Sequence, residues 1–170
     1  LPISDRTVVL GEPGVGKSAL LRFVALSLLD PESPDQSLAP VWGERLPVWL
    51  SFNAWTRALA LDEATNLEDF LFTWLHQHSA DELRPLLADA LQDRRLLLLI
   101  DGLDEQHNQA AANVALDRLD TFLSAHGIPV VITSRPAGYE RVRRPIGEWR
   151  HGRLMDFGSA QIQAFAKFWF

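Results

Sequence analysis

A glycine-rich segment close to the start of the chain has the composition of a phosphate-binding loop. Residues 11–18 read Gly-Glu-Pro-Gly-Val-Gly-Lys-Ser and match the pattern G-x-x-x-x-G-K-[ST] at every fixed position. An apolar run at residues 7–10 precedes the segment and a helical pattern at residues 19–26 follows it, which is the strand–loop–helix context that this pattern needs. Glycines permit a tight turn whose backbone N–H groups point inward toward an anion. The residues that we expect to contact a nucleotide are Gly11, Glu12, Pro13, Gly14, Val15, Gly16, Lys17, Ser18 and Ala19.

Two side chains of this segment have specific chemical roles. A lysine at the position of Lys17 can reach the β- and γ-phosphates, and the Ser18 hydroxyl can ligate Mg²⁺. Only two of the 16 basic residues are lysines, Lys17 and Lys167, so a lysine at this position is informative. The chain lacks an Asn-Lys-x-Asp stretch, which guanine-specific proteins with such a loop typically use to read the base. We therefore expect ATP or ADP, together with Mg²⁺, as the ligands.

An acidic cluster follows the most apolar run of the chain. Residues 96–105 read Leu-Leu-Leu-Leu-Ile-Asp-Gly-Leu-Asp-Glu, so Asp101 comes directly after a buried strand. A carboxylate in such a place needs a compensating cation or donor, and we expect Asp101 to hold Mg²⁺ together with Ser18. Asp104 or Glu105 could orient the water that attacks the γ-phosphate. Their spacing does not separate the two roles, and Glu105 could instead be a solvated acid that caps the next helix.

A basic residue ends another apolar strand. Residues 133–136 read Thr-Ser-Arg-Pro, and Arg135 could stabilise the charge that develops on the γ-phosphate. Equally, Arg135 could form a structural ion pair with Asp101 or Asp104. The residues predicted to take part in catalysis are therefore Lys17, Asp101, Asp104, Glu105 and Arg135.

The spacing of apolar residues predicts strands that alternate with helices. The expected strands are residues 7–10, 47–52, 96–100 and 128–133, with a weaker fifth at 153–157. The expected helices are residues 19–29, 67–78, 80–93, 113–125 and 159–170, the last with Ser159 as its N-cap. This alternation is typical of an α/β fold with a parallel sheet covered on both faces. Because ligands bind at the carboxyl ends of such strands, Gly11, Asp101 and Ser134 should converge on one edge of the sheet.

Composition excludes several kinds of partner. The chain has 170 residues, of which 47% are hydrophobic, enough for one α/β domain with a full core. Its net charge of −6 argues against a nucleic-acid-binding surface, and the absence of cysteine excludes disulfides and thiolate metal sites. The longest apolar run, residues 96–100, is far shorter than the ~20 residues of a membrane span. We expect no membrane partner, no direct nucleic-acid binding and a cytoplasmic location.

Taken in order, the motifs at residues 11–18, 96–105 and 130–136 resemble the NACHT domain, a branch of the signal-transducing STAND class of P-loop NTPases. The distinctive feature is Gly102, a small residue directly after Asp101, followed by the two acids. The resemblance implies a three-layer α/β sandwich with a parallel five-stranded sheet in the order 5-1-4-3-2. It also implies a nucleotide-binding domain at residues 1–158 and the start of a helical lid at residues 159–170.

The resemblance further implies an ATP-hydrolysing molecular switch that self-associates when ATP is bound. Effector and sensor domains would lie outside this segment, and family members act in antiphage defence and innate immunity. We expect a piece of a longer protein, with weak ATPase activity in isolation. The family's winged-helix region, which often contributes a histidine to the β-phosphate, is missing from these residues. Two alternatives stay open: an ATPase that performs mechanical work on nucleic acid or protein, and a scaffold that binds nucleotide without hydrolysing it.

Overall fold

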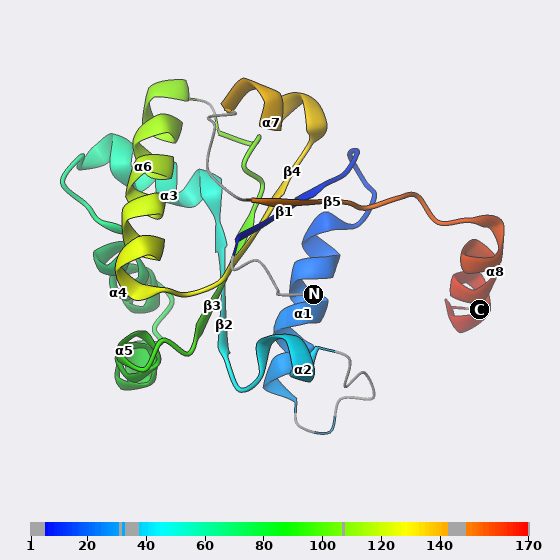
Figure 1. Cartoon of the computed structure of the whole chain (residues 1–170), viewed down its shortest axis with the longest axis horizontal. Coiled ribbons are helices and arrows are strands. Elements are labelled where there is room, and N and C mark those ends of the chain that lie inside the picture. The colour runs from blue at the N-terminus through cyan, green and yellow to red at the C-terminus, as the bar shows by residue number, and fades with distance from the viewer. Residues whose placement is uncertain (1–5, 31, 33–37, 107, 143–148, 170) are drawn as a thin grey trace.

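Five parallel strands form one sheet at the centre of the protein (Figure 1). This computed structural model describes residues 6–30, 32, 38–106, 108–142 and 149–169. The order across the sheet is β2-β3-β4-β1-β5, and all neighbouring strands are parallel. The prediction of a parallel five-stranded sheet in the order 5-1-4-3-2 is therefore confirmed. The strands are β1 (Arg6–Leu10), β2 (Leu46–Ser51), β3 (Leu96–Asp101), β4 (Val130–Ser134) and β5 (Arg150–Arg153).

Helices cover both faces of the sheet, which confirms the three-layer sandwich. One face is covered by α1 (Lys17–Leu29), with the short α2 (Ala39–Trp42) beside it (Figure 1). The opposite face is covered by α3 (Phe52–Leu61), α4 (Leu67–Gln77), α5 (Arg84–Gln92) and α6 (Gln109–His126). A 3₁₀ turn, η1 (Asp81–Leu83), precedes α5. After β4 comes α7 (Pro136–Val142), and after β5 comes α8 (Ser159–Trp169), which lies away from the sheet in Figure 1.

The central strand β3 divides its side chains between two cores. Leu96, Leu98 and Ile100 pack under α3 to α6, whereas Leu97 and Leu99 pack against α1. All five side chains are completely buried. Both faces of such a strand are buried, so its sequence is an uninterrupted run of apolar residues. This is why β3 could be assigned from the sequence.

The two edge strands differ in what they present. In β2, the Leu46 N–H donates a hydrogen bond of 2.6 Å to the carbonyl oxygen of Arg95, so the backbone groups of Leu46 face β3. Successive residues of a strand direct their N–H and C=O groups to opposite sides, so Pro47 faces the free edge. At the opposite edge, all four residues of β5 are exposed.

Three expectations about local structure are wrong. The fifth strand occupies residues 150–153 instead of 153–157, because an exposed edge strand needs no apolar residues when β1 supplies its ladder. Phe52 begins α3 and does not end β2, because the Ser51 hydroxyl caps the helix by accepting from the Ala54 N–H at 3.4 Å. Ser159 is the first residue of α8 and not its N-cap; the Gly158 carbonyl accepts from the Ile162 N–H.

Three helices, α2, α3 and α7, were not expected from the sequence. The helix α2 lies between α1 and β2, where the sequence predicts neither a helix nor a strand. The helix α7 begins at Pro136, and proline suits the first position of a helix because its missing N–H has no helical partner there. Pro136 thus both ends β4 and starts α7. The division of the chain at residue 158 stays a prediction.

Candidate functional site

The glycine-rich loop lies between β1 and α1, at the carboxyl edge of the sheet. Gly14 and Gly16 have φ values of +80° and +99°, in the left-handed region that favours glycine. At Gly11, an added Cβ would lie 2.6 Å from Cγ1 of Val15, so the loop closes tightly only without a side chain there. The Gly11 N–H donates to the Ser134 carbonyl oxygen at 3.1 Å and ties the loop to β4. The sequence thus builds a tight loop that is anchored to β4.

Lys17 is held inside this loop by the backbone. Its ammonium Nζ donates to the carbonyl oxygens of Gly11 at 2.8 Å and Glu12 at 3.0 Å. Lys17 is also the first residue of α1, whose N-cap Gly16 offers no capping side chain. The free N–H groups of the first turn and the positive end of the helix therefore add to the ammonium charge. This is a favourable place for a phosphate.

Asp101 ends β3 and is oriented by a buried threonine on the neighbouring strand. The Thr133 hydroxyl donates to Oδ1 of Asp101 at 2.6 Å and accepts from the Gly102 N–H at 3.0 Å. Thr133 is completely buried, so this hydroxyl has no competing water. Sequence reasoning missed Thr133. The signal was available, because a threonine at the end of an apolar strand needs a polar partner.

Glu105 folds back over Gly102. Gly102 has a φ of +74°, and a Cβ added to it would lie 2.8 Å from both Cδ and Oε2 of Glu105. The Glu105 N–H donates to the Gly102 carbonyl oxygen at 3.0 Å, which closes the turn. The glycine after Asp101 therefore provides the space that the Glu105 carboxylate occupies.

Asp104 lies in a different environment, although it is adjacent to Glu105 in the sequence. Its Oδ2 lies 3.1 Å from Nε of Arg135, and its Oδ1 accepts from the Arg135 N–H at 2.8 Å. The Asp104 side chain is 7% exposed, whereas the Arg135 side chain is 49% exposed. Of the two ion pairs considered for Arg135, the structure therefore has the one with Asp104 and not the one with Asp101.

A cavity of about 240 Å³ opens where these elements meet. Four of the expected site residues do not line this cavity: Gly11, Glu12, Val15 and Asp104. Glu12 and Val15 instead border a smaller cavity of about 50 Å³ beside residues 153–156. The larger of the two, which we call the phosphate cavity, is lined by Pro13, Gly14, Gly16, Lys17, Ser18, Ala19, Asp101, Gly102, Glu105 and Arg135.

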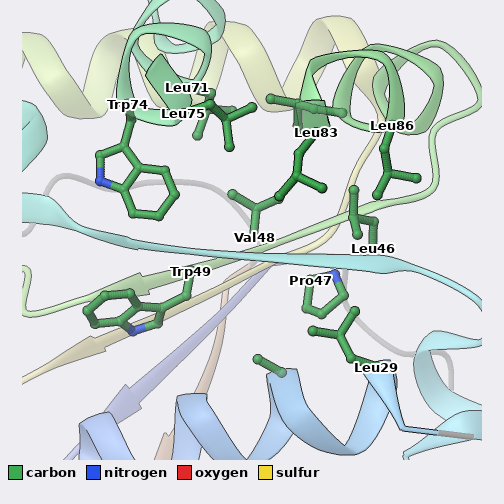
Figure 2. A pocket seen from close by; sticks show the side chains of 12 residues that line it. Leu29, Leu46, Pro47, Val48, Trp49, Leu71, Trp74, Leu75, Leu83 and Leu86 are labelled. Carbon is green, nitrogen blue, oxygen red and sulfur yellow. The ribbon is translucent and has the colours of Figure 1, made fainter. Parts of the chain in front are cut away.

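A larger cavity of about 410 Å³ lies elsewhere, around the free edge of β2 (Figure 2). Figure 2 shows Val48 on one side of the β2 ribbon, facing Leu71 and Leu75, and Trp49 on the opposite side. All twelve residues that line this cavity are apolar. A triphosphate needs charged or N–H donors. The phosphate cavity is therefore suited to a nucleotide, and the apolar cavity around β2 is not.

The residues that could hold Mg²⁺ are Ser18 and Asp101, which both line the phosphate cavity. Mg²⁺ is usually bound by one or two carboxylates together with substrate phosphates and water. One hydroxyl, one oriented carboxylate and a loop shaped for phosphate fit that requirement. Among the described residues, no group of three or more His, Cys, Asp or Glu side chains is arranged to hold a metal ion. None of the described helices has the length and apolar character needed to cross a membrane.

The fold and this site together define a class of protein. A parallel sheet with a glycine-rich loop between β1 and α1, and with Asp101 at the end of β3, is a nucleotide-binding P-loop NTPase module. The family model of the NACHT domain matches residues 5–170. The chain therefore belongs to the NACHT family, as its motifs predict.

Comparison of structures supports the same fold. The chain is similar to Hsp104 in a closed-state structure with ATPyS and FITC casein, with a TM-score of 0.59 and 18% identity over 95% of this chain. It is also similar to PCH-2 of C. elegans, with a TM-score of 0.50 and 15% identity over 99% of this chain. The chain spans 25% of the Hsp104 chain and 42% of the PCH-2 chain. A sequence comparison with curated proteins gives no significant match.

Proposed function

We propose that this domain binds and hydrolyses ATP and acts as a molecular switch in a signalling NTPase. The observation that carries the proposal is the phosphate cavity, where the glycine-rich loop, Asp101, Glu105 and Arg135 meet. Each of these groups could contact one part of the triphosphate of ATP or of its Mg²⁺ ion. Membership of the NACHT family supports the switching role.

The loop and Lys17 would bind the β- and γ-phosphates. In support, Lys17 already contacts two loop carbonyls, and the first turn of α1 has unused N–H groups. Ser18 and Asp101 would hold Mg²⁺, which when bound neutralises charge on the phosphates. Thr133 would keep the Asp101 carboxylate turned toward the cavity.

Glu105 would orient the water that attacks the γ-phosphate. Its carboxylate is exposed and lines the phosphate cavity, so it can accept a proton or a hydrogen bond from water there. Arg135 also lines the cavity and would stabilise the charge that develops on the γ-phosphate. Because that charge is absent from ADP, Arg135 would distinguish the two nucleotides.

The wider role rests on the family. We propose that the domain self-associates in its ATP-bound form and that effector and sensor domains, outside these 170 residues, receive and pass on the signal. Residues 1–158 would form the nucleotide-binding domain and α8 the first helix of a lid. An immune or antiphage role in the cytoplasm is part of the same proposal.

Nucleotide titration of the purified chain tests the first step. With Mg²⁺ present, a fluorescent ATP analogue should bind more tightly than the corresponding GTP analogue. Lys17→Ala should abolish ATP binding and change the melting temperature little, because the two carbonyl oxygens that the Lys17 ammonium contacts belong to the surface loop and not to the core. The matched control is Lys167→Ala, which removes the second lysine of the chain, exposed on α8, and should bind as wild type does. Unchanged ATP affinity in a folded Lys17→Ala variant would contradict the site.

A further inference from the structure

Both oxygens of the Asp104 carboxylate contact residues at the end of β4 or directly after it. Besides the two contacts with Arg135, its Oδ1 lies 3.3 Å from the Ser134 hydroxyl, whose single proton can go to Asp104 or to the Arg135 carbonyl oxygen at 3.1 Å. Both oxygens therefore have protein partners, and the side chain is 7% exposed. A group that orients attacking water needs a free oxygen directed at the cavity. Asp104 does not line the phosphate cavity, and each of its oxygens already contacts Arg135 or Ser134.

The contact leaves the far end of Arg135 available. Asp104 accepts a hydrogen bond from the backbone N–H of this arginine and forms an ion pair with its Nε. The two terminal nitrogens, Nη1 and Nη2, make no hydrogen bond to any residue that the structure describes, and the side chain borders the phosphate cavity. A guanidinium held by Nε presents its remaining donors in a fixed plane, which suits the oxygens of a phosphate.

A glycine in α7 makes the close contact possible. A Cβ added to Gly138 would lie 2.0 Å from Cβ and 3.1 Å from Cα of Asp104. Gly138 is buried, and the Tyr139 N–H donates to the Arg135 carbonyl oxygen at 2.9 Å within the same turn of helix. The start of α7 is therefore packed directly on Asp104, and Arg135 is fixed at both its backbone and its side chain.

We propose that Asp104 is a positioning residue, which fixes Arg135 for contact with the γ-phosphate, while Glu105 alone acts on the attacking water. The proposal rests on the proposed function of the same cavity. It assigns different roles to two adjacent acids. It also explains the glycine at position 138, because a side chain there would overlap Asp104. Asp104 acts on the nucleotide only through Arg135.

A double-mutant cycle tests this assignment. ATP and ADP affinities are measured for wild type, Asp104→Asn, Arg135→Ala and the double variant, all in the presence of Mg²⁺. Asp104→Asn keeps an oxygen for the Arg135 N–H but loses the charge opposite Nε, so it should weaken ATP by about tenfold and barely change ADP. The double variant should lose no more than Arg135→Ala alone, because the two residues act as one unit. Additive losses, or an Asp104→Asn variant with wild-type ATP preference, would overturn the proposal.

Glu105→Gln is the matched control, since it also neutralises one acid of the pair. It should keep the ATP preference of wild type and lose turnover. If Asp104→Asn behaves as Glu105→Gln does, with unchanged affinity and slow turnover, Asp104 is a water-orienting residue and the proposal is wrong.

A nucleotide-free measurement separates this proposal from the proposed function. In chain labelled with ¹⁵N-arginine, the Nε–H resonance of Arg135 is identified by its loss in Arg135→Lys. That resonance should shift in Asp104→Asn and stay in place in Glu105→Gln. If the Nε–H resonance did not shift in Asp104→Asn, Asp104 would not hold Arg135 in place. Failure of wild type to bind ATP would instead reject the proposed function.

Discussion

The Thr133 hydroxyl lies 2.6 Å from Oδ1 of Asp101 and connects the ends of β4 and β3. The same hydroxyl accepts a hydrogen bond from the Gly102 N–H. One buried group thus provides a hydrogen-bond partner for both the Asp101 carboxylate and the Gly102 backbone. A buried group that loses its partner costs about 1–3 kcal/mol. Thr133 therefore links the stability of this sheet edge to the orientation of the proposed Mg²⁺ ligand.

Thr133→Val keeps the shape of the side chain and removes this hydroxyl. We expect a lower melting temperature and a smaller gain in ATP affinity on addition of Mg²⁺. Thermal unfolding and titration with and without Mg²⁺ measure the two effects. Thr133→Ser, which keeps the hydroxyl, should restore most of the Mg²⁺ dependence. If the valine variant kept the full Mg²⁺ dependence, Thr133 would not orient Asp101.

Glu105→Gln should bind ATP with Mg²⁺ but hydrolyse it about 10²-fold or more slowly, since general-base contributions are commonly of that size. Release of inorganic phosphate under single-turnover conditions measures the effect, in a longer protein if the chain alone turns over too slowly. The control is Glu82→Gln, which removes an exposed carboxylate in η1 far from the cavity lining. Equal turnover in Glu105→Gln and wild type would move the water-orienting role to another residue.

Arg135→Ala should weaken ATP and spare ADP. A charge-assisted hydrogen bond to the γ-phosphate contributes ~1.5–3 kcal/mol, which corresponds to roughly a ten- to hundredfold loss of affinity. Titration of both nucleotides measures the ratio, and Arg141→Ala, which removes an exposed arginine at the end of α7, serves as the control. Parallel losses for ATP and ADP with a lower melting temperature would mean that Arg135 only holds the site together.

Gly138→Ala should destabilise the domain, because the new methyl group would overlap Asp104. Forcing a methyl group into a packed site costs about 1–3 kcal/mol, which would lower the melting temperature of a domain of this size by several degrees. Gly152→Ala is the matched control: in β5 the nearest atom to an added Cβ is the Val8 carbonyl oxygen at 3.9 Å, an ordinary contact. A Gly138→Ala variant as stable as Gly152→Ala would show that α7 moves aside freely.

Residue patterns were sufficient to predict β1 to β4, a parallel sheet and the convergence of the motifs. The loop after β1 and the acid after β3 meet because parallel strands bring their carboxyl ends to one edge. The strand order came from the resemblance to the NACHT domain, since apolar runs carry no information about which strands are neighbours. In contrast, β5 was misplaced because Arg150–Arg153 has no apolar alternation and is held only by β1.

The separate environments of Asp104 and Glu105 could not be read from the sequence. Both are acids, one residue apart, and both follow the same strand. What separates them is three-dimensional: the positive φ of Gly102 turns Glu105 toward the cavity, and Gly138 admits Asp104 beneath α7. In the sequence, Gly102 is noticed only as the small residue after Asp101, and Gly138 attracts no notice until the backbone geometry is known.

The proline at the free edge of β2 bears on how the protein avoids aggregation. Apolar side chains flank this strand on both faces, around the cavity of Figure 2, and an open strand in such surroundings is a template for another chain. The backbone groups of Pro47, Trp49 and Ser51 face the free edge. Of these three residues, Pro47 has no N–H to donate. An incoming strand therefore meets an interrupted row of donors and cannot extend a regular ladder along the whole edge. A single residue thus limits sheet growth beside this apolar cavity.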